Sequence, residues 1–382
     1  MAGNGPKTTF MTPFGSRRPF IAVRVSYCGV FPHSMHLTID AGSPRAALMQ
    51  HGEEKMKLPR RQFLSLSVGA GVISIALQSA GADTYPSRSV KIIEPIGAGT
   101  AGDRYLRSIA QELENSHHQA FVVENRPGAG TTIGTDYVAH AAPDGYTLLM
   151  MSTTSTVNET LYAHKSYQLM RDLVPIAPLL DSDLVLVVHP SVPVHNLSEL
   201  IALARAKPGT LNYGSSGLGS NYHMAAELLK NLSGINIIHV PYKGSTGMRT
   251  DILSGQIQLL FDAVPNMAPF IETGQVRALG TSGTTRSSVL PNVPTIAEAG
   301  VPGFQATLWD GLMAPRGTPQ PIIDLLHREI TGFLSRPEFK ASWEKQGVTP
   351  LIMTQAEFTT FIESQIVKWA KVIKSNHIAL VQ

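Results

Sequence analysis

The chain has 382 residues, 43% hydrophobic and 15% charged, a composition typical of a soluble globular protein with room for two domains. Its formal charge of +3 is uneven, because residues 1–82 carry nine of the 31 Lys and Arg but three of the 28 Asp and Glu. The remaining residues, 83–382, have a net charge of −3 and no basic stripe, which argues against nucleic acid as a partner. The single cysteine, Cys28, lies in the first part, so residues 83–382 hold no disulfide, thiolate nucleophile or cysteine-ligated metal.

Residues 1–55 show no sustained hydrophobic period, and we interpret them as a non-native or disordered extension ahead of a true start at Met56. Residues 56–82 are typical of a twin-arginine export signal. The pair Arg60-Arg61 precedes an apolar run, Phe63–Leu77, that is shorter than the about 20 residues of a membrane span.

A small-x-small cleavage site, Ala80-Gly81-Ala82, ends this segment. The sequence therefore predicts cleavage near Ala82 and a periplasmic mature chain with no stable membrane insertion. No cysteine follows the apolar run, so a lipoprotein anchor is excluded.

The mature chain opens with a β-α-β pattern in which strands at Ser89–Ile93 and Ala120–Glu124 flank a helix predicted over Arg104–Glu114. Between the first strand and the helix, Gly97, Gly99 and Gly102 spell GxGxxG. Glu124 stands where a dinucleotide-binding fold carries its ribose-binding acid. An exported dinucleotide-dependent oxidoreductase is thus one alternative. Against it, Glu94-Pro95-Ile96 separates the strand from the first glycine.

A second helix is expected after Gly130 and Gly134, followed by a strand at Tyr146–Met151. Four hydroxyl residues, Ser152–Ser155, follow this strand directly. Open α/β sheets bind their ligands at the carboxyl ends of strands, so this segment is a candidate site.

The second half of the chain continues to alternate strands and helices. Predicted strands lie at Leu184–His189, Ile237–Val240, Ile257–Asp262 and Val276–Thr281, and predicted helices at Asn196–Ala206, Thr246–Ser254, Pro265–Thr273, Pro321–Ser335 and Gln355–Ser375. We expect the chain to cross between domains at Leu184–His189 and to return at Gln305–Trp309. Alternating elements of this length favour parallel sheets covered on both faces.

The stretch Asn212–Leu229 reads NYGSSGLGSNYHMAAELL and predicts a strand, a glycine- and serine-rich loop, and a helix starting near Ser220. Its glycines permit backbone conformations that a Cβ would block. The free N–H groups and the positive end of the helix dipole then face the loop, where the serines add hydroxyl donors. Such a loop binds a carboxylate without Lys or Arg, although it is equally typical of an ordinary strand-to-helix turn.

Nine segments together resemble the Bug receptors, the solute-binding components of tripartite tricarboxylate transporters. They are Pro95–Asp103, Asn125–Gly130 (NRPGAG), Pro143–Leu149 (PDGYTLL), Arg171–Leu173 (RDL), Lys207–Gly209 (KPG), the stretch Asn212–Leu229, Val240–Gly244 (VPYKG), Leu290–Thr295 (LPNVPT) and Trp309–Pro315 (WDGLMAP). The resemblance spans residues 85–382 in order. This chain departs from the family pattern at Thr100, Thr131 and Met151, where glycine is common, and Thr100 would narrow the cleft or add a hydroxyl to it.

The resemblance implies an α/β fold of the type II periplasmic-binding-protein class. Mixed, mostly parallel sheets are flanked by helices, and the ligand lies in an interdomain cleft. Domain 1 would comprise residues 83–183 and 303–382, and domain 2 residues 184–302. Residues expected to bind ligand are Ile96, Gly97, Ala98, Gly99, Thr100, Asp103, Ser152, Thr154, Asn158, Ser215, Ser216, Gly217, Gly219, Ser220, Tyr242, Lys243, Gly244 and Asp262.

The function implied is that of a monomeric periplasmic receptor that captures a small carboxylate and passes it to the membrane components of a tripartite transporter. A ligand sensor for a signalling kinase would share the fold and the site, and remains an alternative. No catalytic residue, cofactor or metal is expected: the chain has no GxSxG elbow, and His223 reads as a helix residue that bonds the loop backbone. Asp262 is expected either to cap the next helix or to accept an amino group of a ligand.

Overall fold

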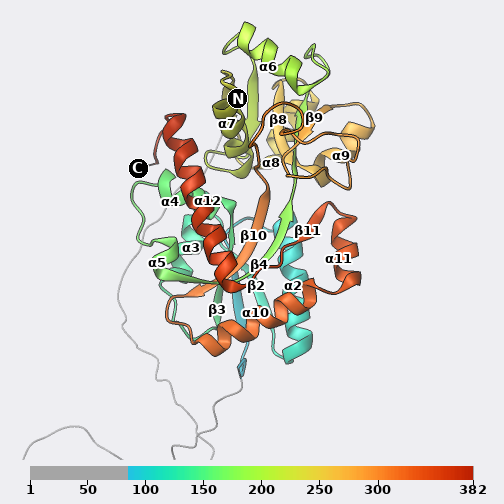
Figure 1. The fold of residues 1–382 in the computed structure, drawn as a ribbon. Helices are drawn as coiled ribbons and strands as arrows, with labels where there is room; N and C mark the ends of the chain where they lie inside the picture. Colours follow the sequence, from blue (N-terminus) through green and yellow to red (C-terminus); the bar gives the residue numbers. More distant parts are fainter. Residues whose placement is uncertain (1–84, 382) are drawn as a thin grey trace, which may run out of the picture. The chain divides into compact units, whose positions relative to one another are not determined.

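The computed structural model describes residues 85–381, and the predicted extension and export signal, residues 1–82, lie outside them. The described chain is α/β, with two mixed sheets joined by continuous backbone (Figure 1). The six-stranded sheet has the order β11 (Val348–Pro350), β4 (Leu173–Ser182), β10 (Leu308–Pro315), β3 (Thr147–Ser152), β1 (Val90–Glu94) and β2 (Phe121–Asn125). The five-stranded sheet has the order β7 (Ile238–Pro241), β6 (Asn212–Ser215), β8 (Leu259–Ala263), β5 (Leu184–Val188) and β9 (Arg277–Thr281).

Each sheet is built around one β-α-β-α-β unit. Strands β2, β1 and β3 are parallel in the first sheet, as are β7, β6 and β8 in the second. The remaining pairs, which involve β4, β5, β9, β10 and β11, are antiparallel. The sheets are mixed as expected, but the described pairs divide into four parallel and five antiparallel. The expectation of mostly parallel sheets was therefore wrong, because the long strands that run to and from the crossing pair antiparallel.

Helices cover both faces of both sheets, and their bounds follow the apolar periodicity. Before the crossing the chain forms α2 (Ala101–His117), the short η1 (Ala129–Thr131), α3 (Thr132–Ala139), α4 (Thr153–Leu161) and α5 (Leu169–Asp172). Between β5 and β9 it forms α6 (Leu197–Ala206), α7 (Asn221–Ser233), α8 (Ser245–Leu253) and α9 (Val264–Glu272), and it ends with α10 (Gln320–Leu334), α11 (Pro337–Glu344) and α12 (Gln355–Ser375).

The last helix, α12, packs against the cores of both sheets (Figure 1). Phe358 and Ile362 near its start are buried in the core under the six-stranded sheet. Trp369, Val372 and Ile373 near its end join the core of the five-stranded sheet. The apolar face of this helix, with its period of 3.6 residues, therefore packs into one core near its start and into the other near its end.

Strand β4 was missed in the sequence because its ten residues, LVPIAPLLDS, include Pro175 and Pro178. Proline has no N–H for a sheet ladder and is rare inside a central strand. The neighbouring strand β10 accommodates both prolines with register shifts, between Asp310 and Gly311 opposite Pro178 and between Leu312 and Met313 opposite Pro175.

The chain crosses from one sheet to the other at Asp183, between β4 and β5, and not within Leu184–His189, which forms β5 itself. It returns through residues 305–307, where the N–H of Ala306 donates to the Ser282 carbonyl, 3.2 Å away, before β10 begins. Ser152 at the end of β3 pairs with Asp310, and Ala263 at the end of β8 pairs with Leu184. The carboxyl ends of the parallel strands in both sheets therefore lie toward the crossing.

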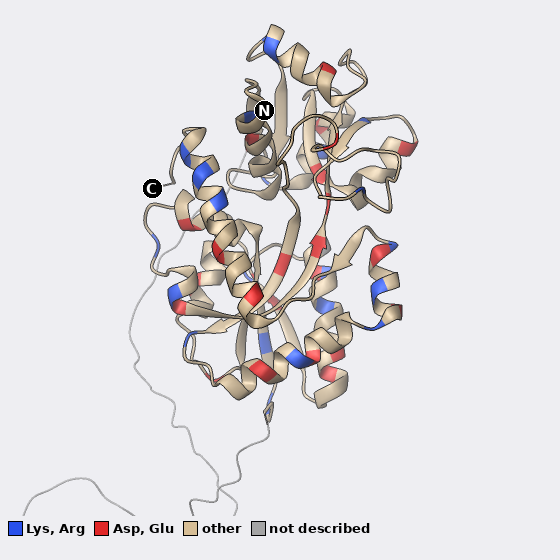
Figure 2. Ribbon diagram, in the orientation of Figure 1, with Lys and Arg blue, Asp and Glu red and all other residues tan. Residues whose placement is uncertain are grey.

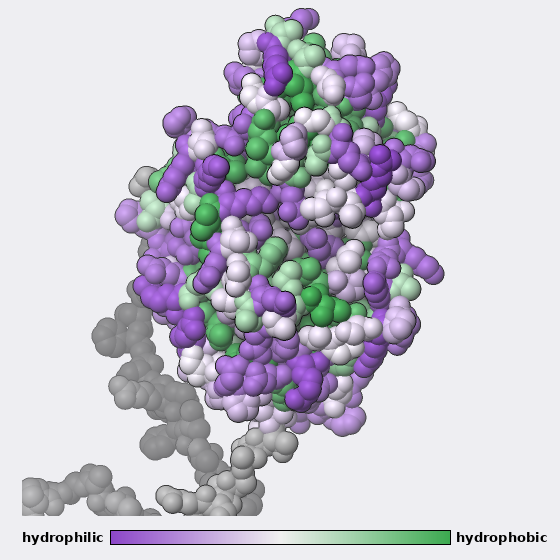
Figure 3. All heavy atoms as spheres, viewed as in Figure 1, coloured by the Kyte–Doolittle hydropathy of each residue, from purple (hydrophilic) through white to green (hydrophobic). Residues whose placement is uncertain are grey.

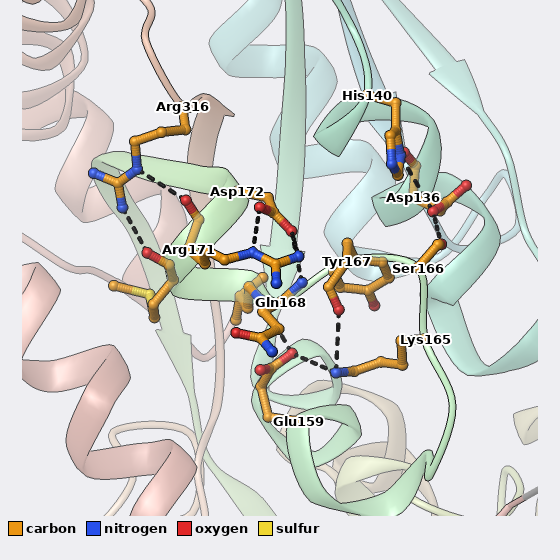
Figure 4. A network of polar contacts seen from close by, with 12 residues as sticks. Asp136, His140, Glu159, Lys165, Ser166, Tyr167, Gln168, Arg171, Asp172 and Arg316 are labelled. Atoms are coloured by element: carbon orange, nitrogen blue, oxygen red, sulfur yellow. Dashed lines mark hydrogen bonds and ion pairs between the residues drawn. The ribbon is translucent and has the colours of Figure 1, made fainter.

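A network of paired charges braces the first sheet at α3, α4 and α5 (Figure 4). The Lys165 ammonium lies 3.1 Å from Glu159, and Arg171 binds Asp172 at 2.7 Å. Arg316, which follows β10, donates to the carbonyls of Met170, Arg171 and Leu173. We call this group, Asp136, Glu159, Lys165, Arg171, Asp172 and Arg316, the paired network.

Hydrophobic residues are interspersed with hydrophilic ones over the face shown in Figure 3, with no single dominant patch. Large exposed hydrophobic side chains are few in the described chain, led by Val367 at 70% and Ile133 at 55% exposure. None of the helices within residues 85–381 combines the length and the apolar character that a bilayer crossing requires.

Candidate functional site

Six helices or helical turns begin at the carboxyl ends of the parallel strands. In the first sheet, α2, η1 with α3, and α4 follow β1, β2 and β3; in the second, α7, α8 and α9 follow β6, β7 and β8. Each helix start carries free N–H groups and the positive end of a dipole. Since both sets of strand ends lie toward the crossing, the arrangement favours an anion there without requiring a free cation.

The carboxylate of Asp103 shapes the first loop, Pro95–Thr100, through hydrogen bonds within the protein. Asp103 is 3% exposed and accepts hydrogen bonds from Gly99 N–H at 3.0 Å and from Arg107 Nη2 at 2.9 Å. Asn125 Nδ2 donates both to Asp103 and to the Ile96 carbonyl, at 3.0 Å each. Burial favours the neutral acid, but these bonds outweigh it and hold the Asp103 pKa below its usual value. Asp103 is therefore a positioning residue for the loop.

Within this loop, Gly97 and Gly99 border open space, since no heavy atom lies within 4 Å of a Cβ built on either. The Thr100 hydroxyl accepts a hydrogen bond from Asp103 N–H at 3.3 Å and thereby caps α2. The departure at Thr100 thus supplies a helix cap.

The nucleotide alternative fits this unit poorly. The Glu124 carboxylate lies 2.9 Å from Lys91 and 2.5 Å from Arg126, and hydrogen bonds from these two cations lower its pKa. Gly102 is packed on Asp310, whose Oδ2 would lie 3.0 Å from a Cβ at that position. The acid expected to hold a ribose is occupied by ion pairs, and the third glycine serves packing.

On the other side of the first sheet, Asn158 of α4 fixes the loop after β2. Its Nδ2 donates to the carbonyl of Gly130 at 2.5 Å and to Thr131 Oγ1 at 3.1 Å. Its Oδ1 is buried and has no hydrogen-bond partner among the described residues. Thr131, the second departure from the family pattern, adopts φ +82°, a conformation that a β-branched residue rarely takes. Its hydrogen bond to Asn158 helps to hold that conformation.

The loop after β6 lies against α4. A Cβ on Gly219 would collide with the Leu161 side chain, and Gly219 has φ +75°, so glycine is required there. Thr154 Oγ1 lies 3.4 Å from Asn221 Oδ1 at the start of α7. The structure therefore brings together two predicted segments, Ser152–Asn158 and Gly214–Ser220, from different sheets.

Ser215 is fully buried and shapes this loop from inside. Its hydroxyl lies 2.6 Å from His239 Nε2 and accepts the N–H of Gly217 at 3.1 Å. The Ser220 hydroxyl caps α7 by accepting the His223 N–H at 3.4 Å. Ser216 is half-buried beside them.

His223 bonds the loop backbone, as predicted. Its Nδ1 accepts the Gly219 N–H at 3.1 Å, which places the ring proton on Nε2. Burial, reinforced by the neighbouring His239, lowers the His223 pKa to about 3, so the imidazole is neutral. A neutral acceptor fits this structural role.

The remaining predicted residues lie on the loops after β7 and β8. The Tyr242 hydroxyl donates to Asp251 at 2.6 Å, Gly244 has φ +101°, and Lys243 is exposed. Asp262 is fully buried and binds Arg249 of α8 through Nε at 2.5 Å and Nη2 at 3.1 Å. Its Oδ1 also accepts the Ala263 N–H at 2.7 Å and Asn266 Nδ2 at 3.0 Å at the start of α9, and the ligand role expected for it stays a prediction.

Arg249 is the cation that sequence reasoning missed. It lies one turn into α8 and 13 residues before Asp262, a spacing that no local rule links. Its side chain is 27% exposed.

Two cavities in the described chain lie apart from these loops. One, of about 390 Å³, adjoins the crossing and is lined by Asp181, Asp183, residues 283–288, Gln305, Thr307, Glu344, Gly347 and Thr349. The other, of about 280 Å³, lies beside the paired network at Thr132, Ile133, Asp136, Tyr162 and residues 164–167. Neither is lined by a predicted ligand residue, so the predicted set stays a prediction. Within residues 85–381 no three His, Cys, Asp or Glu side chains are placed to hold a metal.

Comparison with known proteins identifies the family. Residues 105–378 match the model of the tripartite tricarboxylate transporter family receptor, TctC. Protein BugT of Bordetella pertussis is 38% identical over 313 residues, which cover 80% of this chain and 96% of BugT. A UPF0065 protein from the tcbD-tcbE intergenic region of Pseudomonas sp. strain P51 is 33% identical over 315 residues, 82% of this chain and 94% of that protein.

Solved structures agree in fold. The Rhodopseudomonas palustris protein Rpa4515, solved with adipate, has a TM-score of 0.71 and 34% identity, covering 78% of this chain and all of that one. The periplasmic binding protein BugD has a TM-score of 0.68 and 30% identity over 78% of this chain and all of BugD. MatC of R. palustris, with bound malate, has a TM-score of 0.67 and 29% identity over 76% of this chain and all of MatC.

These likenesses confirm the predicted periplasmic-binding-protein fold and place the protein in the periplasm. Four of the motifs that suggested the family lie at the carboxyl ends of β1, β2, β6 and β7, whereas PDGYTLL leads into β3 and WDGLMAP lies in β10. The chain belongs to the TctC family and is a solute-binding receptor of a tripartite tricarboxylate transporter.

Proposed function

We propose that this receptor captures a small carboxylate at the carboxyl ends of its parallel strands and delivers it to the membrane components of its transporter. The observation that carries the proposal is the meeting of helix starts from both sheets near the crossing. Structures of two relatives with adipate and malate support this ligand class. The ligand is held by backbone N–H groups, hydroxyls and water.

Loops from both sheets contribute ligand-binding residues. Residues Ile96–Thr100 and the start of α4 bind from the first sheet, and Ser216, Gly217 and Gly219 bind from the second. Ser215 and Asp103 act on the ligand indirectly, by fixing the loops that they hydrogen-bond. The division into domains, 83–183 plus 303–382 and 184–302, then permits closure about the ligand, which signals occupancy to the membrane partner.

The proposal treats the protein as a monomeric receptor without enzymatic activity. It also retains export by the twin-arginine route with cleavage near Ala82. Replacing Arg60 and Arg61 by lysine should keep the precursor in the cytoplasm, and N-terminal sequencing of the periplasmic product should begin at Asp83. An uncleaved product, or unimpaired export of the lysine variant, would contradict this part.

The ligand is tested by calorimetry and thermal shift on the purified protein with adipate, malate, succinate and citrate, beside the corresponding amides. Saturable binding of an acid but not of its amide is expected. Ser216→Ala should weaken binding about tenfold to a hundredfold, the cost of one hydrogen bond to a charged group. Ser198→Ala, on an exposed position of α6, is the matched control.

Lys243→Ala discriminates between the proposed site and a cationic one. Because Lys243 is exposed and the proposed donors are neutral, its loss should change affinity little. If Lys243→Ala abolishes binding while Ser216→Ala binds like the parent, the anion is held by a cation and the Gly214–Ser220 loop is only a turn.

A further inference from the structure

Four acidic residues follow one another from the first loop to the crossing. Glu94 is the last residue of β1, Asp310 lies near the start of β10, Asp181 lies near the end of β4, and Asp183 forms the crossing itself. In the ladder Asp310 pairs with Leu180 and its neighbour Trp309 pairs with Asp181, so Asp310 and Asp181 are adjacent positions whose side chains leave opposite faces of the sheet. Figure 2 shows acidic segments in red on the strands that lead to the crossing. We call these four residues the acidic row.

At the loop end, the acidic row is buried without a cation. Glu94 is 1% exposed, and its Oε2 has no hydrogen-bond partner among the described residues. Asp310 is 4% exposed and packs against Gly102 at the start of α2. The other charged groups here are Asp103 and Arg107, which bind each other.

At the crossing end, Asp181 and Asp183 line the cavity of about 390 Å³. Asp181 Oδ1 is buried and lacks a partner in the described chain. Two cations face this end: Lys368 of α12 donates to the Gln305 carbonyl at 2.6 Å and its charge also acts on Asp181, whereas Arg286 binds Glu298 at 2.9 Å. Glu344 of α11, a further acid in the cavity wall, lies 3.7 Å from Lys340.

Burial is the largest influence on the pKa of every acid in the row, and it outweighs the opposing charges of Arg107 at Glu94 and Lys368 at Asp181. Burial raises the pKa of Glu94 well above its usual value, and those of Asp310 and Asp183 to about 7 and of Asp181 to about 6. Next after burial, Asp310 acts on Glu94, and Asp181 acts on Asp310 and on Asp183. Each proton therefore depends on the neighbouring group, and the row titrates as a coupled set.

A bound carboxylate would add negative charge beside Glu94 and Asp310, because the loop Pro95–Asp103 continues directly from Glu94. Ionised acids near an anion are disfavoured, so binding favours the protonated row. By linkage, a binding step that takes up protons becomes tighter as pH falls.

We propose that the acidic row is a proton-responsive element that links the ligand loop to the crossing, so that capture of a carboxylate draws a proton into the row. This inference rests on the proposed function. It makes the receptor load better in acid surroundings and release better in neutral or alkaline ones. The charge on Asp181 and Asp183, at the crossing, would then change when a ligand binds.

The test is calorimetry of the purified protein with the tightest acid of the screen, adipate and malate included, at pH 6, 7 and 8. Each titration is run in two buffers of different ionisation enthalpy, which measures proton uptake. Uptake of up to one proton and affinity rising by as much as about tenfold per pH unit are expected. Ordinary ligand carboxyls titrate near pH 4 and do not contribute in this range.

Glu94→Gln removes one titrating group and should flatten the pH dependence while preserving binding at pH 6. Asp310→Asn should do the same and serves if Glu94→Gln does not fold. Glu124→Gln is the matched control: it stands at the end of the adjacent strand, but Lys91 and Arg126 keep its carboxylate ionised, so it should retain the parental pH dependence.

Binding without proton uptake, or unchanged pH dependence in both Glu94→Gln and Asp310→Asn, overturns the inference alone. Failure of every acid in the screen to bind at any pH overturns the proposed function, and the inference falls with it.

Discussion

The paired network and the acidic row both lie against the six-stranded sheet, and they treat charge in opposite ways. In the paired network, Lys165 and Glu159 are 8% and 14% exposed and neutralise each other, and Glu159 also accepts the Leu169 N–H (Figure 4). In the acidic row, Glu94 and Asp310 are still more buried but have no cation. The buried carboxylate of Glu159 thus has an opposite charge 3.1 Å away, whereas Glu94 and Asp310 have no paired cation.

The direction of the pKa shifts records the same difference. The hydrogen bond from Arg171 lowers the pKa of Asp172 to about 2, whereas burial raises that of Asp310 to about 7. The lesson is that burial by itself does not determine what a carboxylate does. A buried carboxylate with a paired cation stabilises the fold, and one without a cation binds a proton more readily.

The largest effect is expected when the pairing is broken where it is most buried. Lys165→Met should lower the free energy of unfolding by about 3–5 kcal/mol, because it leaves the Glu159 carboxylate buried without its cation. Urea unfolding measures this, and Lys165→Met combined with Glu159→Gln should regain much of the loss.

Lys340→Met is the control, since its pair with Glu344 is exposed and 3.7 Å long. If Lys165→Met is no less stable than Lys340→Met, the charges of the paired network do not brace the fold, and the comparison fails.

An intermediate effect of opposite sign is expected in the acidic row. The folded-state pKa of Asp310, about 7, is above its unfolded value, so its contribution to stability is fully present below about pH 4 and is lost as pH rises through 7. Asp310→Asn abolishes this titration. It should raise the free energy of unfolding by about 2 kcal/mol at pH 8, with a smaller gain at pH 5.

Asp144→Asn, at an exposed ion pair with Arg88, provides the reference for a surface carboxylate. A stability gain for Asp310→Asn that is the same at pH 5 and pH 8 would show that Asp310 does not titrate in this range.

The smallest effect is expected at the exposed edge of the paired network. Arg171→Ala should lower the free energy of unfolding only slightly, since Arg171 is 58% exposed and Asp172 keeps the Gln168 N–H at 2.8 Å. The depressed pKa of Asp172 means that this contribution is present above about pH 4 and is lost as pH falls through 2.

Salt separates this pair from the buried one. Thermal unfolding in 0.05 M and 1 M NaCl should show the Arg171→Ala difference fading at high salt, while that of Lys165→Met persists. Equal salt sensitivity in both variants would argue against the distinction drawn between the two pairs.

Much of the fold was predictable because each strand and helix of the repeated β-α-β units has its own local sequence pattern. The strands β1, β2, β3, β6, β7, β8 and β9 and the helices between them form within a few residues of the predicted positions. Strand β4 was not predictable from pattern, because Pro175 and Pro178 suggest a loop until the bulged partner β10 is known. The short strand β11 and helix α11 carry too little periodicity to be recognised alone.

At the candidate site, two of the predicted carboxylates have partners within the protein, and the predicted ligand set as a whole stays a prediction. Asp103 was taken as a ligand residue, although its partner Arg107, four positions along the same helix, was visible in the sequence. Asp262 is neutralised by Arg249 from another element, and no spacing rule connects them.

The sequence by itself determined the family, the alternation of strands and helices, and the placement of glycines and hydroxyls after the strands. These depend on local propensity and on short motifs, which neighbouring residues specify. Only the tertiary structure decided which charges meet. Glu94, Asp310 and Asp181 are far apart in the chain and become neighbours because β10 inserts between β3 and β4. Their protonation depends on the partners and the burial that this insertion supplies, and neither is encoded in any single segment.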